Sequence, residues 1–257
     1  DILVAGFGLA ACSAAIQAID TDPGAKVLMV EKASEAQAGG DTRASGQGLV
    51  VAKDKDAMVR YHRKMYAPNP VPDDLLEFYA EELMDLHPWI RARAKEANQA
   101  YIQIYPIYEF PELGAVDAVL RYATILPRAG GLWGAFKKNV LKRPIDVWYD
   151  SPATDLIQNH ETGEVIGAVI NRNGKAMQVR ARRAVVLACG GYSANPEMLS
   201  NYCGYTDTPP AGSPHNTGDG IYMLQKAGAD LWHMRNRMYS AGFHLAIQVP
   251  DFKSAFL

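Results

Sequence analysis

The 257-residue sequence predicts an α/β fold organised around a parallel β-sheet. Three observations support this prediction. An apolar run, ILVA (2–5), is followed at once by a glycine-rich turn, GFGLAA (6–11), and by an uncharged, alanine-rich stretch that is typical of a helix. A second apolar run, KVLMVE (26–31), follows a DPG turn and ends on an acidic residue. Short apolar runs of this kind are typical of strands that are buried on both faces.

Each small residue of the glycine-rich turn has a physical reason to be there. Gly6 permits the tight turn out of the first strand, and Gly8 lets the backbone approach a pyrophosphate. Ala11 is small enough for the following helix to pack close to the sheet. The first amides of that helix would face the phosphates. The turn therefore predicts a dinucleotide site at the end of the first strand.

Glu31 provides the second part of this predicted site. It lies twenty residues after Ala11, at the end of the second predicted strand. Folds of this type place a carboxylate there, on the adenosine ribose hydroxyls. The strand, turn, helix, strand and terminal acid together are a more specific signal than the glycine turn alone.

The stretch from Ile2 to Ile19 carries no charge, so a membrane span and a secretion signal are alternatives. Its length is near the lower limit for a span. However, it contains two glycines, Ser13 and Gln17, and it is rich in alanine rather than leucine. A secretion signal also requires a positively charged region first, where only Asp1 is present. The dinucleotide fold is the better interpretation.

The middle of the chain has a different composition. Residues 32–48 are rich in Gly, Ala, Ser and Thr, which predicts a backbone-exposing loop rather than a core element. Residues 56–100 are amphipathic and predict helices, with a start near residues 72–74. The aromatic, proline-punctuated residues 101–112 predict extended chain, and residues 130–143 predict a further helix.

Strand signals dominate the region that follows. Residues 145–157 predict one strand, and the alternating run after it predicts a β-hairpin that turns at Asn173-Gly174. The apolar run AVVLACGGY (184–192) predicts a strand that ends in a glycine pair. Residues 217–229 predict a helix that is capped by Thr217 or Asp219.

Charge and cysteine content exclude several classes of function. The formal net charge of −2 gives no reason to expect nucleic acid or an anionic membrane as a partner. Cys12, Cys189 and Cys203 form no C-x-x-C pair, which argues against a disulfide framework and a zinc site. The six histidines show no metal-ligand spacing either, so no metal is predicted. The cysteines favour a reducing, cytoplasmic compartment.

Four segments resemble a known family. They are GFGLAA (6–11), VEKASEAQAGGDTRASGQG (30–48), RAVVLACGGYSANPEM (183–198) and NTGDGIYMLQKAGADL (216–231). In order and spacing they are similar to the FAD-dependent fumarate reductase and succinate dehydrogenase flavoproteins, which include 3-ketosteroid dehydrogenase and enoate reductase relatives. The resemblance extends from residue 1 to about residue 235.

The resemblance implies a domain organisation. Residues 1–235 would form a Rossmann-like FAD-binding domain with a parallel sheet, a β-hairpin and inserted helices, the helical insertion covering about 56–144. Residues 236–257 would begin a substrate-covering cap domain, whose remainder is absent from this sequence. Because such a cap contributes to catalysis in the family, we expect most catalytic residues to lie beyond residue 257.

The resemblance also implies which residues contact FAD. The pyrophosphate would lie at the glycine-rich turn and the ribose on Glu31. The full set of expected contacts is Gly6, Gly8, Ala10, Ala11, Glu31, Lys32, Ala33, Gly39, Gly40, Asp41, Thr42, Ala44, Ser45, Gly46, Gly48, Ala153, Ala188, Gly190, Gly191, Asn216, Thr217 and Asp219.

The expected FAD is non-covalent. The succinate dehydrogenase branch has a histidine immediately before the threonine of the 32–48 loop and links it to the flavin. Asp41 occupies that position here, and a carboxylate offers no imidazole nitrogen for the bond.

The activity implied by the resemblance is hydride transfer across a carbon–carbon bond next to a carbonyl or carboxyl group. Two other hypotheses come from different classes. One is a nicotinamide-dependent dehydrogenase with the same opening fold, and the other is a non-catalytic flavin-binding or interaction module. The Gly/Ser/Thr-rich loop after Glu31 favours the longer flavin cofactor. The electron donor or acceptor is not predicted.

The substrate expectation depends on one departure from the family pattern. Fumarate-reducing members carry a His-Pro-Thr stretch about twenty residues after the GDG turn, and an ungapped alignment places Tyr239 near that histidine. If the alignment shifts by several residues, His233 or His244 takes that place instead. Tyr239 could also have no catalytic role and be only a packed aromatic residue. The stretch MYSAGF (238–243) suits an apolar ring with one carbonyl better than a small dianion. We therefore expect an enone-type or steroid-like substrate rather than fumarate or another small unsaturated acid, with Tyr239 as a catalytic residue.

Overall fold

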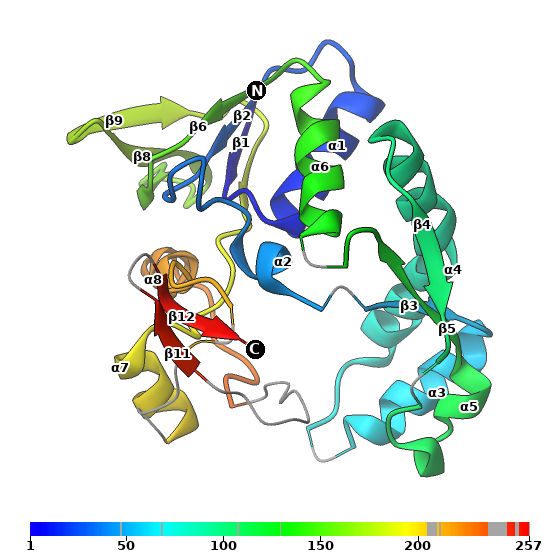
Figure 1. Cartoon of the computed structure of the whole chain (residues 1–257). Coiled ribbons are helices and arrows are strands. Elements are labelled where there is room, and N and C mark those ends of the chain that lie inside the picture. Colours follow the sequence, from blue (N-terminus) through cyan, green and yellow to red (C-terminus); the bar gives the residue numbers. More distant parts are fainter. Residues whose placement is uncertain are drawn as a thin grey trace. The chain divides into compact units, whose positions relative to one another are not determined.

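The computed structural model describes residues 1–46, 48–67, 69–106, 108–128, 130–204, 210, 212–235, 246–249 and 252–256. The chain forms two compact units (Figure 1). The first comprises residues 1–45 and 137–257, and the second comprises residues 46–136. The assignment of residues 1–235 and 236–257 to two domains stays a prediction.

A four-stranded parallel sheet is the centre of the first unit. Its order is β10 (Ala184–Leu187), β1 (Ile2–Ala5), β2 (Val27–Val30) and β6 (Ile145–Trp148) (Figure 1). Residues 3–5 are almost fully buried, as the apolar pattern predicts. Because all four strands run in the same direction, the segments that follow them emerge at one edge of the sheet.

Helix α1 (Leu9–Thr21) follows β1 after a three-residue turn. Its buried face consists of small or aliphatic side chains, namely Ala11, Cys12, Ala15, Ile16 and Ile19. It contacts β1, β2 and β10. The predicted strand–turn–helix–strand unit is confirmed.

A second, antiparallel sheet packs against the parallel one. It consists of β7 (Ala153–Gln158), β8 (Val165–Arg172) and β9 (Lys175–Arg180). The predicted hairpin is confirmed, since Asn173 and Gly174 have φ values of 53° and 74° between β8 and β9. Ala168 and Ile170 of β8 pack against Leu3 of β1 in a shared core.

The prediction of a single strand over residues 145–157 is wrong. The chain pairs with the parallel sheet as β6, breaks, and then joins the antiparallel sheet as β7. Asp150 has a φ of 49° at the break, and Pro152 has no N–H for a sheet hydrogen bond. These two residues separate the strands.

Short helices complete the described part of the first unit. They are α2 (Gly40–Ala44), α7 (Pro196–Met198), the π-helical turn Leu199–Cys203 and α8 (Asp219–Lys226). The helix predicted near residue 217 is present as α8, but its predicted cap is wrong. Gly218 is the N-cap, with a φ of 81° and no side-chain hydrogen bond. The strands β11 (Ala246–Val249) and β12 (Phe252–Phe256) pair antiparallel.

The second unit combines a three-stranded antiparallel sheet with helices. The sheet has the order β3 (Leu49–Ala52), β5 (Val119–Ile125) and β4 (Tyr101–Ile104). The predicted helices of residues 56–100 are α3 (Lys55–Met65) and α4 (Asp73–Glu96). The turn Pro111–Leu113, α5 (Ala115–Ala118) and the start of α6 (Gly131–Leu141) complete it. No helix in the described ranges is long and apolar enough to cross a membrane.

Candidate functional site

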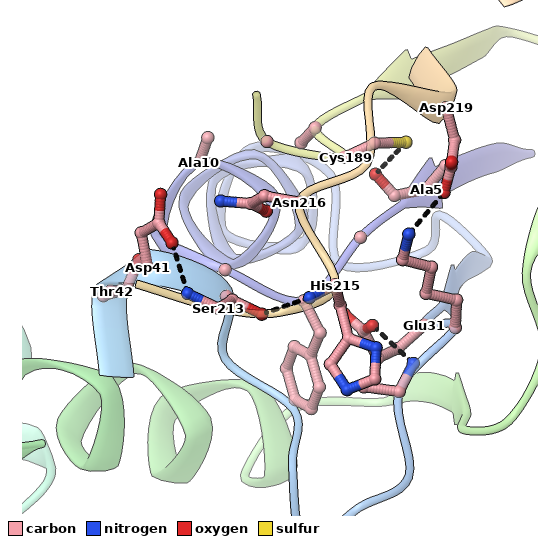
Figure 2. A pocket seen from close by; sticks show the side chains of 18 of the residues that line it. Ala5, Ala10, Glu31, Asp41, Thr42, Cys189, Ser213, His215, Asn216 and Asp219 are labelled. Atoms are coloured by element: carbon pink, nitrogen blue, oxygen red, sulfur yellow. Dashed lines mark hydrogen bonds and ion pairs between the residues drawn. The ribbon is translucent and has the colours of Figure 1, made fainter. Parts of the chain in front are cut away.

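A pocket lies at the carboxyl edge of the parallel sheet, within the first unit (Figure 2). It is formed by the segments that follow β1, β2 and β10, together with part of α2 and the segment before α8. This edge is where open α/β sheets bind their ligands. The lining residues are Ala5, Gly6, Phe7, Gly8, Leu9, Ala10, Val30, Glu31, Lys32, Ala33, Gly40, Asp41, Thr42, Pro152, Ala153, Ala188, Cys189, Gly190, Ser213, His215, Asn216 and Asp219.

The two glycines of the turn after β1 have different constraints. Gly6 has a φ of 111°, and a Cβ built on it would lie 2.3 Å from the carbonyl oxygen of Ala188. Gly8 has an ordinary φ of −83°, and its nearest neighbours to such a Cβ are 3.6 Å away. The fold therefore requires glycine at position 6, whereas at position 8 a Cβ would make only ordinary van der Waals contacts with Gly39 and Thr42.

The N-terminus of α1 faces this pocket, and its N-cap residue has no side chain. Gly8 is the N-cap and makes no side-chain hydrogen bond, and the first turn of the helix contains no acidic residue. The N–H of Leu9 donates to Oγ1 of Thr42 at 2.9 Å, which fixes α2 against the start of α1. A helix N-terminus that is approached over a glycine is suited to a phosphate group.

Glu31 is held in place at the end of β2. Its backbone N–H donates to the carbonyl oxygen of Trp148, the last residue of β6. Its carbonyl oxygen accepts the N–H of Ser151. Its Oε1 accepts the N–H of Ala33 at 2.8 Å, and the side chain lies in the pocket wall (Figure 2). An ionised carboxylate has two oxygens with room for further hydrogen bonds, so Glu31 can also accept two hydroxyl donors.

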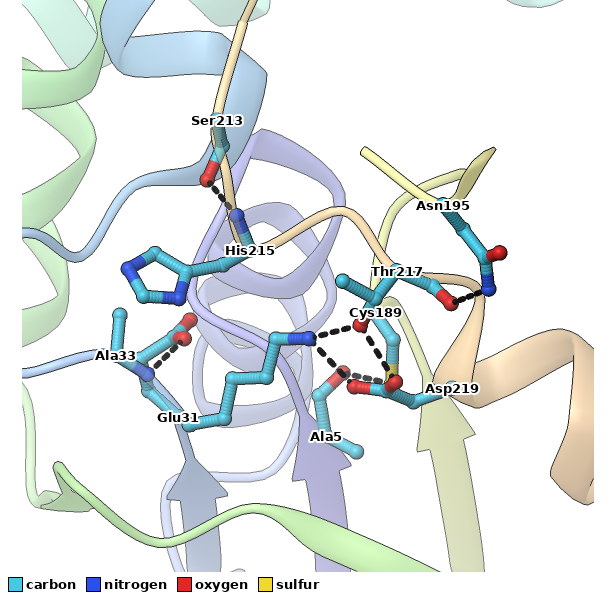
Figure 3. A network of polar contacts seen from close by, with 10 residues as sticks. Ala5, Glu31, Ala33, Cys189, Asn195, Ser213, His215, Thr217 and Asp219 are labelled. Atoms are coloured by element: carbon cyan, nitrogen blue, oxygen red, sulfur yellow. Dashed lines mark hydrogen bonds and ion pairs between the residues drawn. The ribbon is translucent and has the colours of Figure 1, made fainter. Parts of the chain in front are cut away.

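A polar network joins the end of β2 to the start of α8 (Figure 3). Nζ of Lys32 donates to Oγ1 of Thr217 at 2.6 Å and to Oδ2 of Asp219 at 2.7 Å. The Thr217 hydroxyl donates to the other carboxylate oxygen of Asp219 at 2.7 Å. Asn195 Nδ2 donates to the carbonyl oxygen of Thr217. This network explains why Thr217 and Asp219 do not cap α8.

A second connection joins α2 to residue 213. Oδ1 of Asp41 accepts the N–H of Ser213 at 2.7 Å (Figure 2). Oγ of Ser213 then accepts the N–H of His215 at 3.2 Å, and Nε2 of His215 lies 3.2 Å from Oε1 of Gln37. Asp41 is exposed, whereas Ser213 is buried.

The segment after β10 closes the remaining side of the pocket. Gly190 has a φ of 77°, and a Cβ there would lie 2.5 Å from Oδ1 of the buried Asn216. Gly191 accepts the N–H of Gly218 at 3.0 Å. The Cys189 thiol donates to the oxygen of Ala5, and burial raises its pKa to about 11. It is therefore a protonated thiol at neutral pH.

A model of the FAD binding domain family matches residues 1–257, which is the whole chain. The chain belongs to this family. Its cofactor is FAD, and the flavin hypothesis replaces the nicotinamide alternative.

Characterised relatives of this FAD-binding chain include two curated enzymes. It is 29% identical over 245 residues to the NADH:fumarate oxidoreductase of Klebsiella pneumoniae (strain 342), a match that covers 89% of this chain and 24% of that protein. It is 34% identical over 98 residues to the 3-oxosteroid 1-dehydrogenase of Comamonas testosteroni, covering 32% and 17% of the two chains. The matched region is less than a quarter of either relative's length.

A solved structure has the same fold. The 3-ketosteroid-delta4-(5alpha)-dehydrogenase of Rhodococcus jostii RHA1, in complex with 4-androstene-3,17-dione, matches with a TM-score of 0.76 and 26% identity. The match covers 91% of this chain and 55% of that one. The expected fold class, a Rossmann-like FAD-binding domain with parallel and antiparallel sheets, is confirmed.

The residues of the pocket fit FAD. The start of α1 suits a pyrophosphate, because Gly8 and Ala10 line the pocket there and Gly8 has no side chain to fill the space beside it. Glu31 provides the acceptor for ribose hydroxyls at the adjacent strand end. At Gly6 and Gly190, backbone rather than a side chain lines the pocket.

The structure brings most of the expected contact residues to this pocket. Those that line it are Gly6, Gly8, Ala10, Glu31, Lys32, Ala33, Gly40, Asp41, Thr42, Ala153, Ala188, Gly190, Asn216 and Asp219. Ala11, Gly39, Ala44, Ser45, Gly191 and Thr217 belong to the same unit but are not in the lining, and Gly46 and Gly48 belong to the second unit. Tyr239 lies outside the described residues. Direct contact of any of these residues with FAD stays a prediction.

The sequence patterns do not single out several of the residues that line the pocket. Cys189 is one of them, because it lies inside the run AVVLACGGY, which predicts only a strand and a glycine pair. Ser213 and His215 immediately precede the NTGDG motif, and their polar side chains beside Pro214 were the available signal. Their partners Asp41 and Gln37 are more than 170 residues away, so no local pattern in the sequence predicts these two pairs.

Proposed function

We propose that this chain is the FAD-binding part of an oxidoreductase that acts on a carbon–carbon bond next to a carbonyl group. Bound FAD supplies the site that accepts or donates hydride. The observation that supports the proposal most is the pocket at the carboxyl edge of the parallel sheet, in a chain of the FAD-binding family. The relatives named above act on fumarate and on 3-oxosteroids, which agrees with this reaction class.

The residues of the chain position the cofactor. The start of α1 holds the anionic diphosphate through backbone N–H groups, and Glu31 holds the adenosine ribose. Ala11, Ala15 and Ile16 keep α1 packed on the sheet, so the helix start has a fixed position. Phe7 and Val30 are buried at the base of the pocket and exclude water from that side.

We propose an enone-type or steroid-like substrate, apolar with a carbonyl group. The methionine and aromatic residues of 238–243 support this choice, and Tyr239 is the catalytic residue in the proposal. A phenol can donate a hydrogen bond to the carbonyl oxygen and stabilise the enolate charge that develops during hydride transfer. The three cysteines, none of which forms a disulfide, agree with a cytoplasmic location.

The second candidate is a reductase of fumarate or another small unsaturated acid. The Klebsiella relative, which matches 89% of this chain, favours it. A third candidate, a flavin-binding piece without activity of its own, follows from the share of the relatives that the chain spans.

A turnover assay of the full-length protein separates these candidates. We expect a 3-ketosteroid or another cyclic enone to be turned over and fumarate to be poor, with loss of activity in Tyr239→Phe. Efficient fumarate reduction, with no response to any enone and no loss in Tyr239→Phe, would overturn the substrate and the role of Tyr239. A purified protein without a flavin spectrum, even after incubation with FAD, would contradict the proposal as a whole.

A further inference from the structure

Residues 212–219 form a wall of the pocket that is not part of any sheet. Ser213, His215, Asn216 and Asp219 of this segment line the pocket directly (Figure 2). The segment ends at the N-terminus of α8, and it lies opposite residues that follow β2 (Figure 3). The position of this wall therefore depends on contacts between distant parts of the chain.

Those contacts come from a short N-terminal stretch. Asp41 accepts the N–H of Ser213, and Gln37 pairs with the ring of His215. Lys32 binds both Thr217 and Asp219. The paired residues are 172 to 187 positions apart in the sequence.

Lys32 is engaged by the protein itself. Its ammonium donates to a hydroxyl and to a carboxylate at 2.6 and 2.7 Å, and Asp219 receives a further hydrogen bond from Thr217. A lysine in this place that served only to attract phosphate would have its charge directed at the ligand. Here the charge is directed at Asp219, which neutralises it.

We propose that Lys32 and Asp41 are positioning residues that hold the 212–219 segment in place over the FAD site. Lys32 acts on the cofactor through Asp219 and Thr217, not through its own contact with the phosphates. The proposal rests on FAD occupying this pocket. We call the contacts of Lys32 with Thr217 and Asp219 the first tether, and the contact of Asp41 with Ser213 the second tether. We expect loss of either tether to raise the rate of FAD release.

The ion pair between Lys32 and Asp219 gives this proposal a salt dependence. The two side chains are 23% and 36% exposed, so ions reach them and screen the attraction. We expect Lys32→Met to raise the FAD dissociation rate constant about tenfold at low salt, the scale of one hydrogen bond to a charged group. The difference from wild type should shrink at 1 M NaCl.

A double-mutant cycle separates positioning from direct contact. FAD dissociation is followed by stopped-flow fluorescence for wild type, Lys32→Met, Asp219→Asn and the double variant. If Lys32 acts through Asp219, Lys32→Met has little further effect in the Asp219→Asn background. Lys226→Met is the matched control. It removes a lysine that forms an ion pair with Asp155 at 2.6 Å, close to the 2.7 Å between Lys32 and Asp219, and neither Lys226 nor Asp155 lines the pocket. It should release FAD at the wild-type rate.

The second tether is tested without the cofactor. Hydrogen–deuterium exchange of the FAD-free protein reports the N–H of Ser213, which Asp41 accepts. Asp41→Ala should raise exchange in residues 212–219, whereas Asp41→Asn retains an acceptor oxygen and should restore much of the protection.

The outcomes distinguish this inference from the proposed function. If wild-type protein binds no FAD, the proposed function fails. If wild type binds FAD but Lys32→Met releases it at the wild-type rate, the positioning role of Lys32 is overturned. An equal effect of Lys32→Met with and without the Asp219 carboxylate would assign Lys32 to direct contact instead. Unchanged exchange in Asp41→Ala would overturn the role of Asp41.

Discussion

Gly6 and the carbonyl oxygen of Ala188 are so close that a Cβ on residue 6 would lie 2.3 Å from that oxygen. The two residues follow the neighbouring strands β1 and β10, and the N–H of Ala188 donates to the oxygen of Ala5. The close approach of the two chain segments therefore depends on the missing side chain.

This relationship predicts that Gly6→Ala destabilises the fold. The substitution introduces a side chain at a φ of 111° and pushes on backbone rather than on a flexible side chain. We expect a loss of at least about 1–3 kcal/mol in the free energy of unfolding, measured by urea denaturation.

Gly8→Ala is the matched control. It should cost the FAD-free protein no more than about 1 kcal/mol, because alanine is a poorer N-cap than glycine, and should weaken FAD binding more than about tenfold, because it adds a methyl group to the pocket lining. Equal stability losses in both variants would contradict the distinction.

Glu31→Ala should weaken FAD binding by about 1–3 kcal/mol, the usual range for a charged hydrogen-bond partner. The side chain is buried in the pocket wall and is held by the N–H of Ala33. Isothermal titration of the FAD-free protein measures the change. Glu35→Ala is the control, because Glu35 is an exposed carboxylate four residues away that pairs with Lys137. Unchanged affinity in Glu31→Ala would remove Glu31 from the ribose site.

FAD should be released completely by acid precipitation. Asp41 stands at the position where the succinate dehydrogenase branch links a histidine to the flavin. The only cysteine of the pocket lining, among the described residues, is Cys189, whose pKa of about 11 keeps it a poorly nucleophilic thiol at neutral pH. The measurement is the flavin absorbance of the pellet and the supernatant. Flavin that stays with the polypeptide would show that a covalent bond forms.

The second unit should lose stability in mild acid through His62. This residue of α3 is packed beside Tyr61, Tyr66 and Tyr79, and its Nδ1 is buried without a hydrogen bond among the described residues. Burial lowers the pKa of His62 below its usual 6.5. The unfolded chain therefore takes up a proton at a higher pH than the folded chain, and stability falls as the pH drops through 6.5.

Urea unfolding at pH 7.5 and pH 5.5 tests this prediction. Other groups also titrate in this range, so the comparison is with His62→Gln, which should show a smaller loss between the two pH values. His160, which is exposed in the turn between β7 and β8, provides the control substitution His160→Gln. The same pH dependence in wild type and His62→Gln would exclude His62 as the cause.

Local sequence signals were sufficient for the elements near the chain start. The run of residues 2–5 and the turn at Gly6 depend on their immediate neighbours, and both are confirmed, as is the place of Glu31 directly after β2. The break between β6 and β7 was missed, although Asp150 and Pro152 were local signals for it. The role of Thr217 and Asp219 was different. A capping role is the local expectation, but Lys32 binds both side chains from 185 and 187 positions away. Such a partner is set by the sheet order, which periodicity and spacing do not reveal.

The order of the parallel sheet also has a consequence for protein synthesis. Strand β1, one of the two inner strands, is made before the other three strands of this sheet, but its neighbour β10 begins at residue 184, and Asp219 follows later still. At about 5–20 residues per second, the glycine turn waits roughly 10–40 s for the residues that complete its pocket. FAD present in the cell during that interval therefore meets an incomplete binding site, without the lining residues from Ala188 to Asp219. The nascent chain must hold β1, an apolar strand with one unpaired edge, until β10 is made.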